Sequence, residues 1–506
     1  MRRHNLATGH GKVVVVGAGL GGLAAAIHLA AAGAEVTLLE REHVPGGRAG
    51  RIMRAGYAFD TGPTVLTMPN LLDELFALAG ERMSDHLSIV RLDPAYRAVF
   101  HDGSVVRVRA GLDALAAEVR EVCGASEADR LLRLAAHLRA LYEATYGDFI
   151  DRNYDSPVDL VRRPAPLLRL VRLGGFRRMH ALIASFLQDW RLIRLFTFQA
   201  MYAGMSPFEA LGIYAVIPYM DTVAGVYFPR GGIHAVSEAL AGLAARLGVD
   251  LRLGEPVEAV EVTDGRARAV RTAGGQRVAL DVVVLNPDLP VAYRDLLPPR
   301  SAPWRVERLR YSPSCVVAHL GLAQRLHDAA HHNIHFARGY EASFADLLAG
   351  RMQRDPSWFL TVPTRSDPHL APLGGEVAFQ LLPAPNLQET AKGHRIDWDA
   401  RAEQELTEAV KRMEAAGYGP VHEAIVASEV VTPADWAQQG MAAGTPFAAS
   451  HHFRQTGPFR PANVAPKVGG VVFSGSSTTP GVGVPMVLVS GKLAAERVLA
   501  QLGTPR

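Results

Sequence analysis

The chain has 506 residues, of which 48% are hydrophobic and 20% are charged, and its formal net charge is +3. A chain of this length exceeds what one hydrophobic core supports, so two or three domains are expected. The small net charge gives no electrostatic basis for binding nucleic acid. The two cysteines, Cys123 and Cys315, form no CxxC pair, which excludes a disulfide oxidoreductase and a cysteine-rich zinc site and is typical of a reducing cytoplasm.

Neither a signal peptide nor a membrane-spanning helix is predicted. Residues 1–12 are polar and lack the apolar core of a signal peptide. No uninterrupted apolar run approaches the roughly 20 residues that a membrane-spanning helix needs. We therefore expect a chain that is soluble or lies on a membrane surface.

A glycine-rich turn follows the first apolar run. Residues 13–16 are consecutive valines, which predict a buried parallel strand. Gly17 allows the tight turn after such a strand, Gly19 lets the backbone approach a pyrophosphate, and Gly22 lets the next helix pack close to the strand. The N-terminus of that helix presents free N–H groups and the positive end of its dipole to phosphates. This pattern predicts a dinucleotide-binding site.

An acidic residue ends the second predicted strand. Residues 35–39 form that strand, and Glu40 follows it at about the offset where a carboxylate accepts the hydroxyl of an adenosine ribose. Because strand, glycines, helix, strand and acid occur in this order, a dinucleotide is favoured over a glycine-rich turn in another α/β unit. Glu40 would repel a 2′-phosphate and argues against NADP, although Arg41 beside it weakens that argument. Neither residue distinguishes NAD from FAD.

Two further glycine motifs follow, at residues 45–48 and 57–64. Paired glycines followed by arginine resemble the second signature of the superfamily of FAD-dependent amine oxidases and carotenoid desaturases. The resemblance implies that this segment runs along the flavin diphosphate, for which the planar guanidinium of Arg48 is a suitable donor. A solvated loop position is the alternative for Arg48. The other residues implied as cofactor contacts here are Gly46, Gly47, Gly62, Pro63 and Thr64.

The apolar pattern predicts the elements of the middle of the chain. A helix is expected over residues 70–79, and strands over 88–100 and 104–109 are expected to be joined by a turn at Asp102 and Gly103. Residues 111–144 are expected to be helical. Further on, the pattern predicts a helix over 234–247 and short strands over 249–253, 257–262, 267–272, 278–280 and 281–285.

A basic and apolar stretch occupies residues 162–188, which contain no Asp or Glu. Arginines alternate there with leucine, valine and phenylalanine, and the apolar residues between 179 and 190 are expected to form one face of a helix. A basic amphipathic segment is typical of contact with an anionic membrane surface. The alternative is a pair of ordinary helices whose apolar sides face the core and whose arginines are solvated.

Residues 291–465 form a long second region. Strands are expected over 314–320 and 376–382, and a helix over 399–416. The sequence also places histidines at 331, 332 and 335. Neighbouring residues on a strand point to opposite faces, and no carboxylate or cysteine lies at ligand spacing, so no metal site is expected.

The last predicted unit is another strand, glycine-rich loop and helix. A strand over 470–475 ends at Gly475, and the loop after it opens a helix over 486–499. A helix N-terminus suits the C2 carbonyl of a flavin, where negative charge develops on reduction. The cofactor site is thus expected to close the N-terminal part of the chain against the C-terminal part. The residues expected at this helix start are Val484, Pro485 and Met486.

From Lys12 to Arg497 the chain resembles bacterial phytoene desaturases, which are FAD-dependent carotenoid desaturases. The resemblance implies an α/β fold with two dinucleotide-binding (Rossmann-like) domains for FAD, a discontinuous α+β substrate domain and a helical membrane-contacting region. It also implies that the backbone of Val257 bonds beside the adenine. The matching stretches are residues 45–48, 59–64, 227–236, 285–297, 330–334 and 475–491.

The implied division of the chain alternates between these parts. FAD-binding parts are expected over residues 1–75, 227–292 and 466–506. Parts of the substrate domain are expected over 76–150 and 293–465, and the helical, membrane-contacting region at the substrate entrance over 151–226.

The resemblance further implies that phytoene, a neutral polyene, is desaturated stepwise towards neurosporene or lycopene. Such a molecule offers no charge and no hydrogen bond, so a long apolar tunnel is expected to bind it. A hydride would pass to the flavin and a proton would leave afterwards, which demands no strong base. The side chains considered as catalytic groups are Asp221 and His234, and for His234 a local bond at a helix start is favoured.

The electron acceptor is expected to be oxygen or a membrane quinone, because no second GxGxxG predicts a domain for NAD(P)H. A cytoplasmic chain, peripheral on the inner face of the cell membrane, favours the quinone. Four alternatives stay open: a redox-neutral flavin carotene isomerase, a ketolase or later-pathway carotenoid desaturase, a flavin amine oxidase, and a non-catalytic escort of the same fold.

Overall fold

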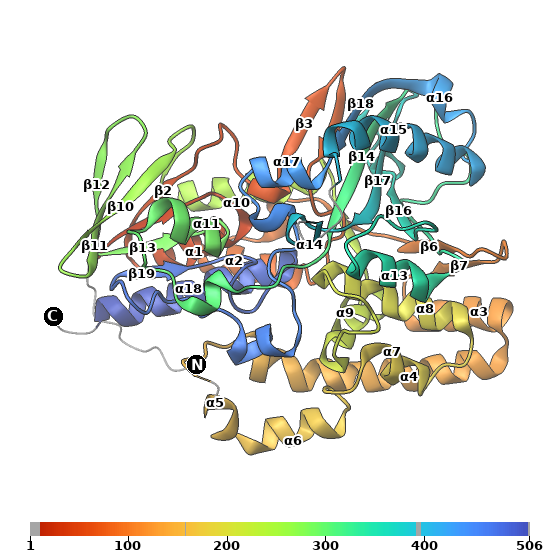
Figure 1. Ribbon diagram of the computed structural model, residues 1–506, viewed down its shortest axis with the longest axis horizontal. Coiled ribbons are helices and arrows are strands. Elements are labelled where there is room, and N and C mark those ends of the chain that lie inside the picture. Colours follow the sequence, from red (N-terminus) through yellow and green to blue (C-terminus); the bar gives the residue numbers. More distant parts are fainter. Residues whose placement is uncertain (1–10, 157, 391–395, 504–506) are drawn as a thin grey trace.

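The structure, a computed structural model, describes residues 11–156, 158–390 and 396–503. The polar N-terminal segment considered for a signal peptide lies almost wholly outside these ranges. Two large sheets organise the chain (Figure 1), a five-stranded sheet in the left half of the view and a seven-stranded sheet in the right half. A layer of helices lies below the seven-stranded sheet.

The five-stranded sheet is parallel throughout, in the order β19-β13-β1-β2-β9. Its strands come from distant parts of the chain, which brings the two predicted glycine-rich turns to one sheet. The bounds are β1 (Lys12–Val16), β2 (Glu35–Leu39), β9 (Asp250–Arg252), β13 (Val282–Leu285) and β19 (Val471–Phe473). The predicted strands of this sheet are therefore confirmed, with shifts of one or two residues at their ends.

Both faces of this sheet are covered, which explains the unbroken valine run. Val13 and Val15 pack with the helices α1 (Leu20–Ala31), α10 (His234–Arg246) and α18 (Val484–Gly503). Val14 and Val16 pack on the opposite side with a small antiparallel sheet. Because side chains alternate along a strand, an apolar residue is needed at every position. That small sheet contains β10 (Val257–Thr263), β11 (Arg266–Thr272) and β12 (Arg277–Ala279).

The first and last long helices pack directly against each other. A Cβ atom added to Gly491 of α18 would lie only 2.5 Å from the carbonyl oxygen of Gly21 in α1. Glycine at these positions therefore allows backbone to approach backbone. This contact holds the N-terminal glycine turn next to the start of α18.

The seven-stranded sheet has the order β18-β14-β17-β16-β15-β6-β7, and only the β15–β6 pair is parallel. The predicted strands over 314–320 and 376–382 are confirmed as the long central pair. The bounds are β6 (Tyr96–Val99), β7 (Val105–Val108), β14 (Ser314–Leu322), β15 (His332–His335), β16 (Trp358–Thr361), β17 (Glu376–Ala384) and β18 (Ile425–Val431). The remaining strands form two antiparallel pairs: β3 (Arg51–Arg54) with β4 (Tyr57–Asp60), and β5 (Ile89–Arg91) with β8 (Tyr227–Pro229).

Helices fill the space between and below the sheets. Those of the helical layer are α3 (Leu112–Cys123), α4 (Ala125–Thr145), α5 (Val158–Val161), α6 (Pro164–Arg172), α7 (Met179–Ala184), α8 (Trp190–Phe198) and α9 (Val216–Pro218). The others are α2 (Asn70–Leu78), α11 (Leu289–Val291), α12 (Trp304–Glu307), α13 (Tyr340–Leu348), α14 (Leu387–Thr390), α15 (Trp398–Ala415), α16 (Val421–Ala424) and α17 (Pro433–Gln438). In the described ranges, no helix combines the length and the apolar character that crossing a membrane requires.

Two predicted elements are divided in the structure. The single strand expected over 88–100 is wrong, because Pro94 has no N–H for a sheet ladder and separates β5 from β6. These two strands join different partners, β8 and β7. The continuous helix expected over 111–144 is also wrong, because Gly124 adopts a φ of +97° and separates α3 from α4.

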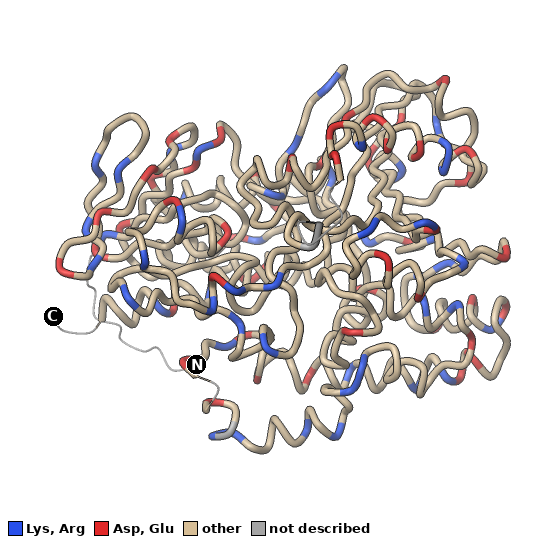
Figure 2. The backbone as a smooth tube through the Cα atoms, in the orientation of Figure 1, with Lys and Arg blue, Asp and Glu red and all other residues tan. Residues whose placement is uncertain are grey.

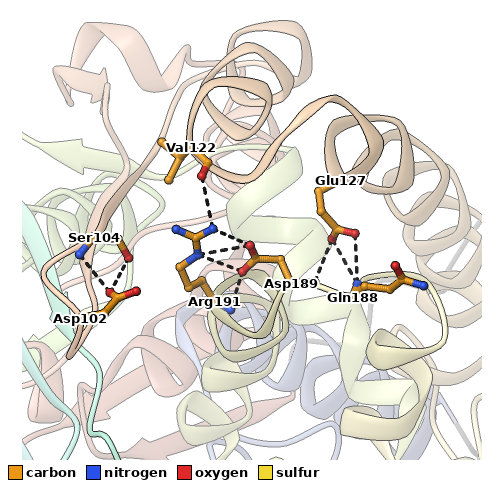
Figure 3. A network of polar contacts seen from close by, with 7 residues as sticks. All are labelled: Asp102, Ser104, Val122, Glu127, Gln188, Asp189 and Arg191. Carbon is orange, nitrogen blue, oxygen red and sulfur yellow. Dashed lines mark hydrogen bonds and ion pairs between the residues drawn. The ribbon is translucent and has the colours of Figure 1, made fainter.

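The single helical face expected between 179 and 190 is wrong as well. Helix α7 ends at Ala184, and α8 begins at Trp190. Figure 3 shows what stabilises the turn between them: the carboxylate of Glu127 accepts the backbone N–H groups of Gln188 and Asp189, both at 3.1 Å. Asp189 in turn accepts the N–H of Arg191 at 2.8 Å and caps α8. The periodicity of the apolar residues continues across this break, although the helix does not.

Candidate active site

A cavity of about 1320 Å³ joins the predicted nucleotide site to an apolar space between the two sheets and the helical layer. Every predicted cofactor residue except Gly22 lines it, from all three distant segments of the chain. These residues are Gly17, Gly19, Glu40, Arg41, Gly46, Gly47, Arg48, Gly62, Pro63, Thr64, Val257, Gly475, Val484, Pro485 and Met486.

The first glycine turn forms a cradle that side chains would fill. Gly17 has a φ of +100°, and a Cβ atom on Gly22 would lie 2.0 Å from the carbonyl oxygen of Gly17. Gly22 thus allows helix α1 to pack closely against the turn, and it does not line the cavity. A Cβ atom on Gly19 would lie 2.7 Å from the amide oxygen of Asn286, a residue that sequence reasoning did not single out. The open backbone at the start of α1 fits a pyrophosphate.

Glu40 is held rigidly at the end of β2. Its two carboxylate oxygens accept the N–H groups of Ala18 at 2.6 Å and Glu42 at 3.0 Å, and its side chain is buried. Each oxygen retains a lone pair for a hydroxyl donor, which fits a ribose. Arg41 turns to Glu42, with 3.0 Å between the charged groups, and to the carbonyl oxygen of Gln439 at 2.6 Å.

The adenine-side segment lies next to Glu40. The N–H of Glu255 donates to the carbonyl oxygen of Glu40 at 2.7 Å, and β10 begins two residues later at Val257. This pairing places Val257 on the cavity wall near Glu40, the carboxylate that is expected at the ribose.

Arg48 is positioned by residues far along the chain. Its Nη2 lies 2.8 Å from Oδ1 of Asp288, and its Nη1 donates to the hydroxyl of Ser476 at 3.2 Å. Its Nε is buried and has no partner within the described residues. Such an orphaned donor beside the glycine pair of residues 46–47 fits an anionic group of a cofactor. Sequence reasoning found Arg48 but not Asp288.

The C-terminal loop is fixed by a buried arginine that sequence reasoning missed. Arg460 donates to the carbonyl oxygens of Ser476 at 2.6 Å and Thr478 at 2.8 Å. Burial lowers the pKa of Arg460 to about 10. These bonds shape the loop between β19 and α18, so the N-terminus of α18 opens onto the cavity. No local pattern around residue 460 indicates this role.

Beyond the nucleotide residues, the wall becomes apolar. Its side chains come from α5, α6 and the loop after it, from the stretch between the end of α8 and the turn after α9, and from central strands of the seven-stranded sheet. Such a wall fits an elongated, uncharged ligand. The residues are Leu160, Leu167, Leu170, Val171, Phe176, Phe198, Met201, Leu211, Ile213, Val216, Ile217, Met220, Val317, Phe359, Phe379 and Leu381.

Of the two side chains considered as catalytic groups, only Asp221 lines the cavity. Burial raises the pKa of Asp221 to about 7. His234 lies outside the cavity at the start of α10. Its Nδ1 is 3.0 Å from the carbonyl oxygen of Ala49, and its Nε2 is 3.5 Å from the Glu238 carboxylate. His234 therefore has a local structural contact and no access to the cavity.

The histidines near residue 331 also have local partners. The ring nitrogens of His332 face the carbonyl oxygens of Ala95 and Thr64, both at 3.2 Å, and His335 Nε2 lies 2.8 Å from the Tyr418 hydroxyl. Across the part of the chain that the structure describes, no group of His, Cys, Asp or Glu side chains is arranged to hold a metal ion.

Comparison with known proteins identifies the family. Residues 20–499 match the family described as flavin containing amine oxidoreductase. The chain belongs to this family. It is 50% identical over 490 residues to the phytoene dehydrogenase of Streptomyces griseus, with 96% of this chain and 94% of the relative covered. It is 38% identical over 491 residues to the zeta-carotene-forming phytoene desaturase of Myxococcus xanthus, again covering 96% and 94%.

Solved structures support the fold. Cyclohexylamine oxidase from Brevibacterium oxydans superposes with a TM-score of 0.60 at 18% identity, covering 98% of this chain and all of that one. The predicted FAD fold, the flavoprotein family and its resemblance to bacterial phytoene desaturases are thereby confirmed. The cofactor is FAD, and the chain is a flavin-dependent oxidoreductase.

Proposed function

We propose that this chain desaturates phytoene, removing hydrogen stepwise towards neurosporene or lycopene. The observation that carries the proposal is the continuous cavity, which leads from the cradle for FAD into a space walled by aliphatic and aromatic side chains. Two relatives with high coverage are named for activity on phytoene, which supports this substrate class. An amine oxidase is less well supported, because an amine needs a polar site.

In this proposal the protein binds FAD and the substrate, orients them towards each other and excludes water from the site. FAD, when bound, supplies the acceptor for a hydride from the substrate. Gly17, Gly19 and Glu40 would hold its adenosine diphosphate, and Arg48 with the start of α18 would hold the flavin end. The apolar wall excludes water and binds the polyene through buried area, at about 25 cal/mol per Å² before the losses of association.

We propose further that α6 and its neighbours place the chain on the inner face of the cell membrane. Leu168 and Val171 of α6 are 54% and 52% exposed, and Phe176 is 42% exposed. Val171 and Phe176 also line the cavity, so the exposed apolar patch lies at the place where a membrane-dissolved substrate would enter. Arginines also occur along α6 and just before it (Figure 2), and an anionic lipid surface attracts such charges.

A quinone in that membrane is our proposed electron acceptor, and oxygen is the alternative.

The positive charge of residues 162–172 supports membrane binding more weakly than the exposed apolar side chains do. Arg162, Arg163 and Arg169 each have a carboxylate within 4.0 Å. Their attraction to lipid is therefore partly offset within the protein.

The deciding experiment is expression in cells that already make phytoene, followed by pigment extraction. Yellow or red pigment with several absorption peaks is expected, and the peak positions count the new double bonds. Colourless phytoene in cells shown to contain flavin-loaded protein would contradict the desaturase. Product that keeps the number of double bonds but changes its absorption would identify an isomerase, and an oxygenated product a ketolase.

A further inference from the structure

We propose that Asp221 is the catalytic base that accepts the proton leaving the substrate after hydride removal. The inference rests on the proposed desaturase function and names a residue for its second half-step. Asp221 lies in the short π-helical turn η6 (Tyr219–Val223), is 1% exposed and lines the cavity.

Asp221 differs from the other acids of the cavity wall. Glu40 is occupied by two backbone N–H groups at the nucleotide end. The other acids have arginine partners: Glu42 with Arg41, Asp288 with Arg48, and Asp295 with Arg294. Among the described residues, no basic side chain lies within 4.0 Å of Asp221. A carboxylate without a cation in an apolar cavity has a strong tendency to take up a proton.

Hydroxyl groups orient this carboxylate. The Thr222 hydroxyl donates to its Oδ1 at 2.6 Å, and the Tyr96 hydroxyl donates to its Oδ2 at 3.3 Å. The Tyr202 hydroxyl then donates to the Tyr96 oxygen at 3.2 Å. Tyr202 also lines the cavity, so a continuous chain of three oxygen-bearing groups connects the carboxylate with the space for the substrate. A proton on Asp221 can return to the cavity through this chain.

The cluster lies close to Thr64, in the segment that is expected to contact FAD. The carbonyl oxygen of Thr64 faces Nε2 of His332 at 3.2 Å. The His332 ring stacks on the Tyr96 ring, with 5.5 Å between centroids, and Tyr96 bonds to Asp221. Only two side chains therefore separate the carboxylate from Thr64, which is an expected contact of the cofactor. Proton acceptor and hydride acceptor would thus meet the substrate in the same part of the cavity.

A C–H bond of the substrate breaks with its electron pair, and FAD, when bound, would accept this hydride. The neighbouring carbon then loses H⁺ to an oxygen of Asp221, and the electrons of that C–H bond form the new C=C bond. Asp221 becomes a neutral carboxylic acid, which releases its proton through Tyr96 and Tyr202 before the next cycle.

An anchoring role alone does not require a carboxylate. Asparagine has nearly the same shape and no tendency to bind a proton: its amide oxygen would accept from one of the two hydroxyls, and its NH2 group would donate to the oxygen of the other. The substitution Asp221→Asn therefore separates the two roles. Glu127→Gln is the matched control, because Glu127 is a buried carboxylate that accepts backbone N–H groups away from the cavity (Figure 3).

The experiment compares the flavin-loaded proteins with phytoene in lipid vesicles and an added quinone. For Asp221→Asn we expect the turnover rate to fall about 100-fold, the lower range for loss of a general base, while flavin content stays unchanged. Deuterium on the carbon that loses the proton should slow the variant more strongly than the wild type, because proton loss becomes limiting. Glu127→Gln should keep the wild-type rate and isotope effect.

A readout without turnover completes the test. The infrared carbonyl band of a protonated carboxylic acid should be present in the wild-type protein below neutral pH, titrate away above it, and be absent from Asp221→Asn. Equal rates and equal isotope effects in Asp221→Asn and the wild type would overturn the assignment, as would a carbonyl band unaffected by the substitution. A wild-type protein that leaves phytoene unchanged would instead overturn the desaturase function itself.

Discussion

The guanidinium of Arg48 lies 2.8 Å from the carboxylate of Asp288, although 240 residues separate them in the sequence. Asp288 also accepts the Ser477 hydroxyl at 2.9 Å and the N–H of Ala442 at 3.0 Å. This one buried carboxylate therefore joins the glycine pair before Arg48 to the C-terminal loop that opens α18. Both segments line the cavity for FAD, so the ion pair sets their separation.

Replacing Asp288 by asparagine should weaken FAD binding. The variant keeps the shape but loses the charge that orients Arg48, and loss of a hydrogen bond to a charged group is worth about 1.5–3 kcal/mol. We expect FAD affinity to fall at least tenfold, measured by titrating flavin-free protein and following flavin fluorescence. Asp85→Asn removes an exposed pair with Arg82 and should leave FAD affinity unchanged. Equal affinity in both variants would show that Arg48 needs no partner.

Gly22→Ala should weaken FAD binding more strongly than Asp288→Asn does. The added methyl group would lie 2.0 Å from the Gly17 carbonyl oxygen, so either the turn or α1 has to move. We expect protein with little bound flavin and a lower melting temperature, measured from the ratio of flavin to protein absorbance and by thermal unfolding. Gly147→Ala is the control, because its added methyl group meets no atom within 4 Å and its φ is not in the left-handed region. Full flavin content in Gly22→Ala would contradict the cradle.

The candidate nucleotide site could be predicted because its signals are local. A strand, a glycine turn, a helix and an acid within about 30 residues each have a physical requirement that one residue type meets, so Gly17, Gly22 and Glu40 could be found without a structure. The same holds for the loop before α18. The division into six segments stays a prediction, although the five-stranded sheet does take its strands from three separate parts of the chain.

The supporting residues were not predictable, because their partners are remote. The side chain of Asn286 faces Gly19, Asp288 pairs with Arg48, and Arg460 donates to the carbonyl oxygen of Ser476. No periodicity of the sequence indicates such contacts. The prediction of one helical face between residues 179 and 190 was wrong for a related reason. The apolar period continued, while the Glu127 carboxylate from another helix stabilised a turn. Tertiary hydrogen bonds thus override a local pattern.

The buried Asp221 should make the stability of the protein depend on pH. Its pKa is about 7 in the folded protein, against an ordinary value of 3.8. Between these values the folded state holds a proton that the unfolded state has lost, so stability is highest below pH 4 for this group and falls as pH rises to 7. The neighbouring Tyr96 and Tyr202 have raised pKa values, and His332 a lowered one of about 4, so these groups stay neutral over the upper part of that range.

Asp221→Asn should remove this dependence. Below pH 4 the variant and the wild type should unfold alike, whereas at pH 8 the variant should be the more stable by up to about 4 kcal/mol, of which about 2.7 kcal/mol develops between pH 5 and pH 7, at 1.36 kcal/mol per pKa unit. Thermal unfolding of both proteins across this pH range measures the difference. A gain in stability joined to a loss of turnover is expected of a side chain kept for chemistry. A constant difference between pH 5 and pH 8 would contradict the raised pKa.

Binding to membranes should depend on the exposed apolar side chains near the cavity mouth. Leu168 of α6 and Val158 of α5 are both 54% exposed. Inserting such side chains into lipid is worth about 1.5–3 kcal/mol each, so replacing both by glutamate should weaken binding to anionic phosphatidylglycerol vesicles at least tenfold, measured by co-sedimentation. Binding of the wild type should also weaken in high salt, because the arginines of α6 contribute by charge.

The control for this surface is Leu373→Glu. Leu373 is fully exposed and lies before β17, away from the residues that line the cavity. It should leave vesicle binding unchanged, because only a patch that includes the cavity mouth needs to enter the lipid. If Leu373→Glu weakened binding as much as the double change in α5 and α6, the contact would be a general effect of surface charge. Wild-type protein that failed to sediment with anionic vesicles at low salt would refute the membrane location, while the apolar cavity would still allow a polyene delivered by a carrier.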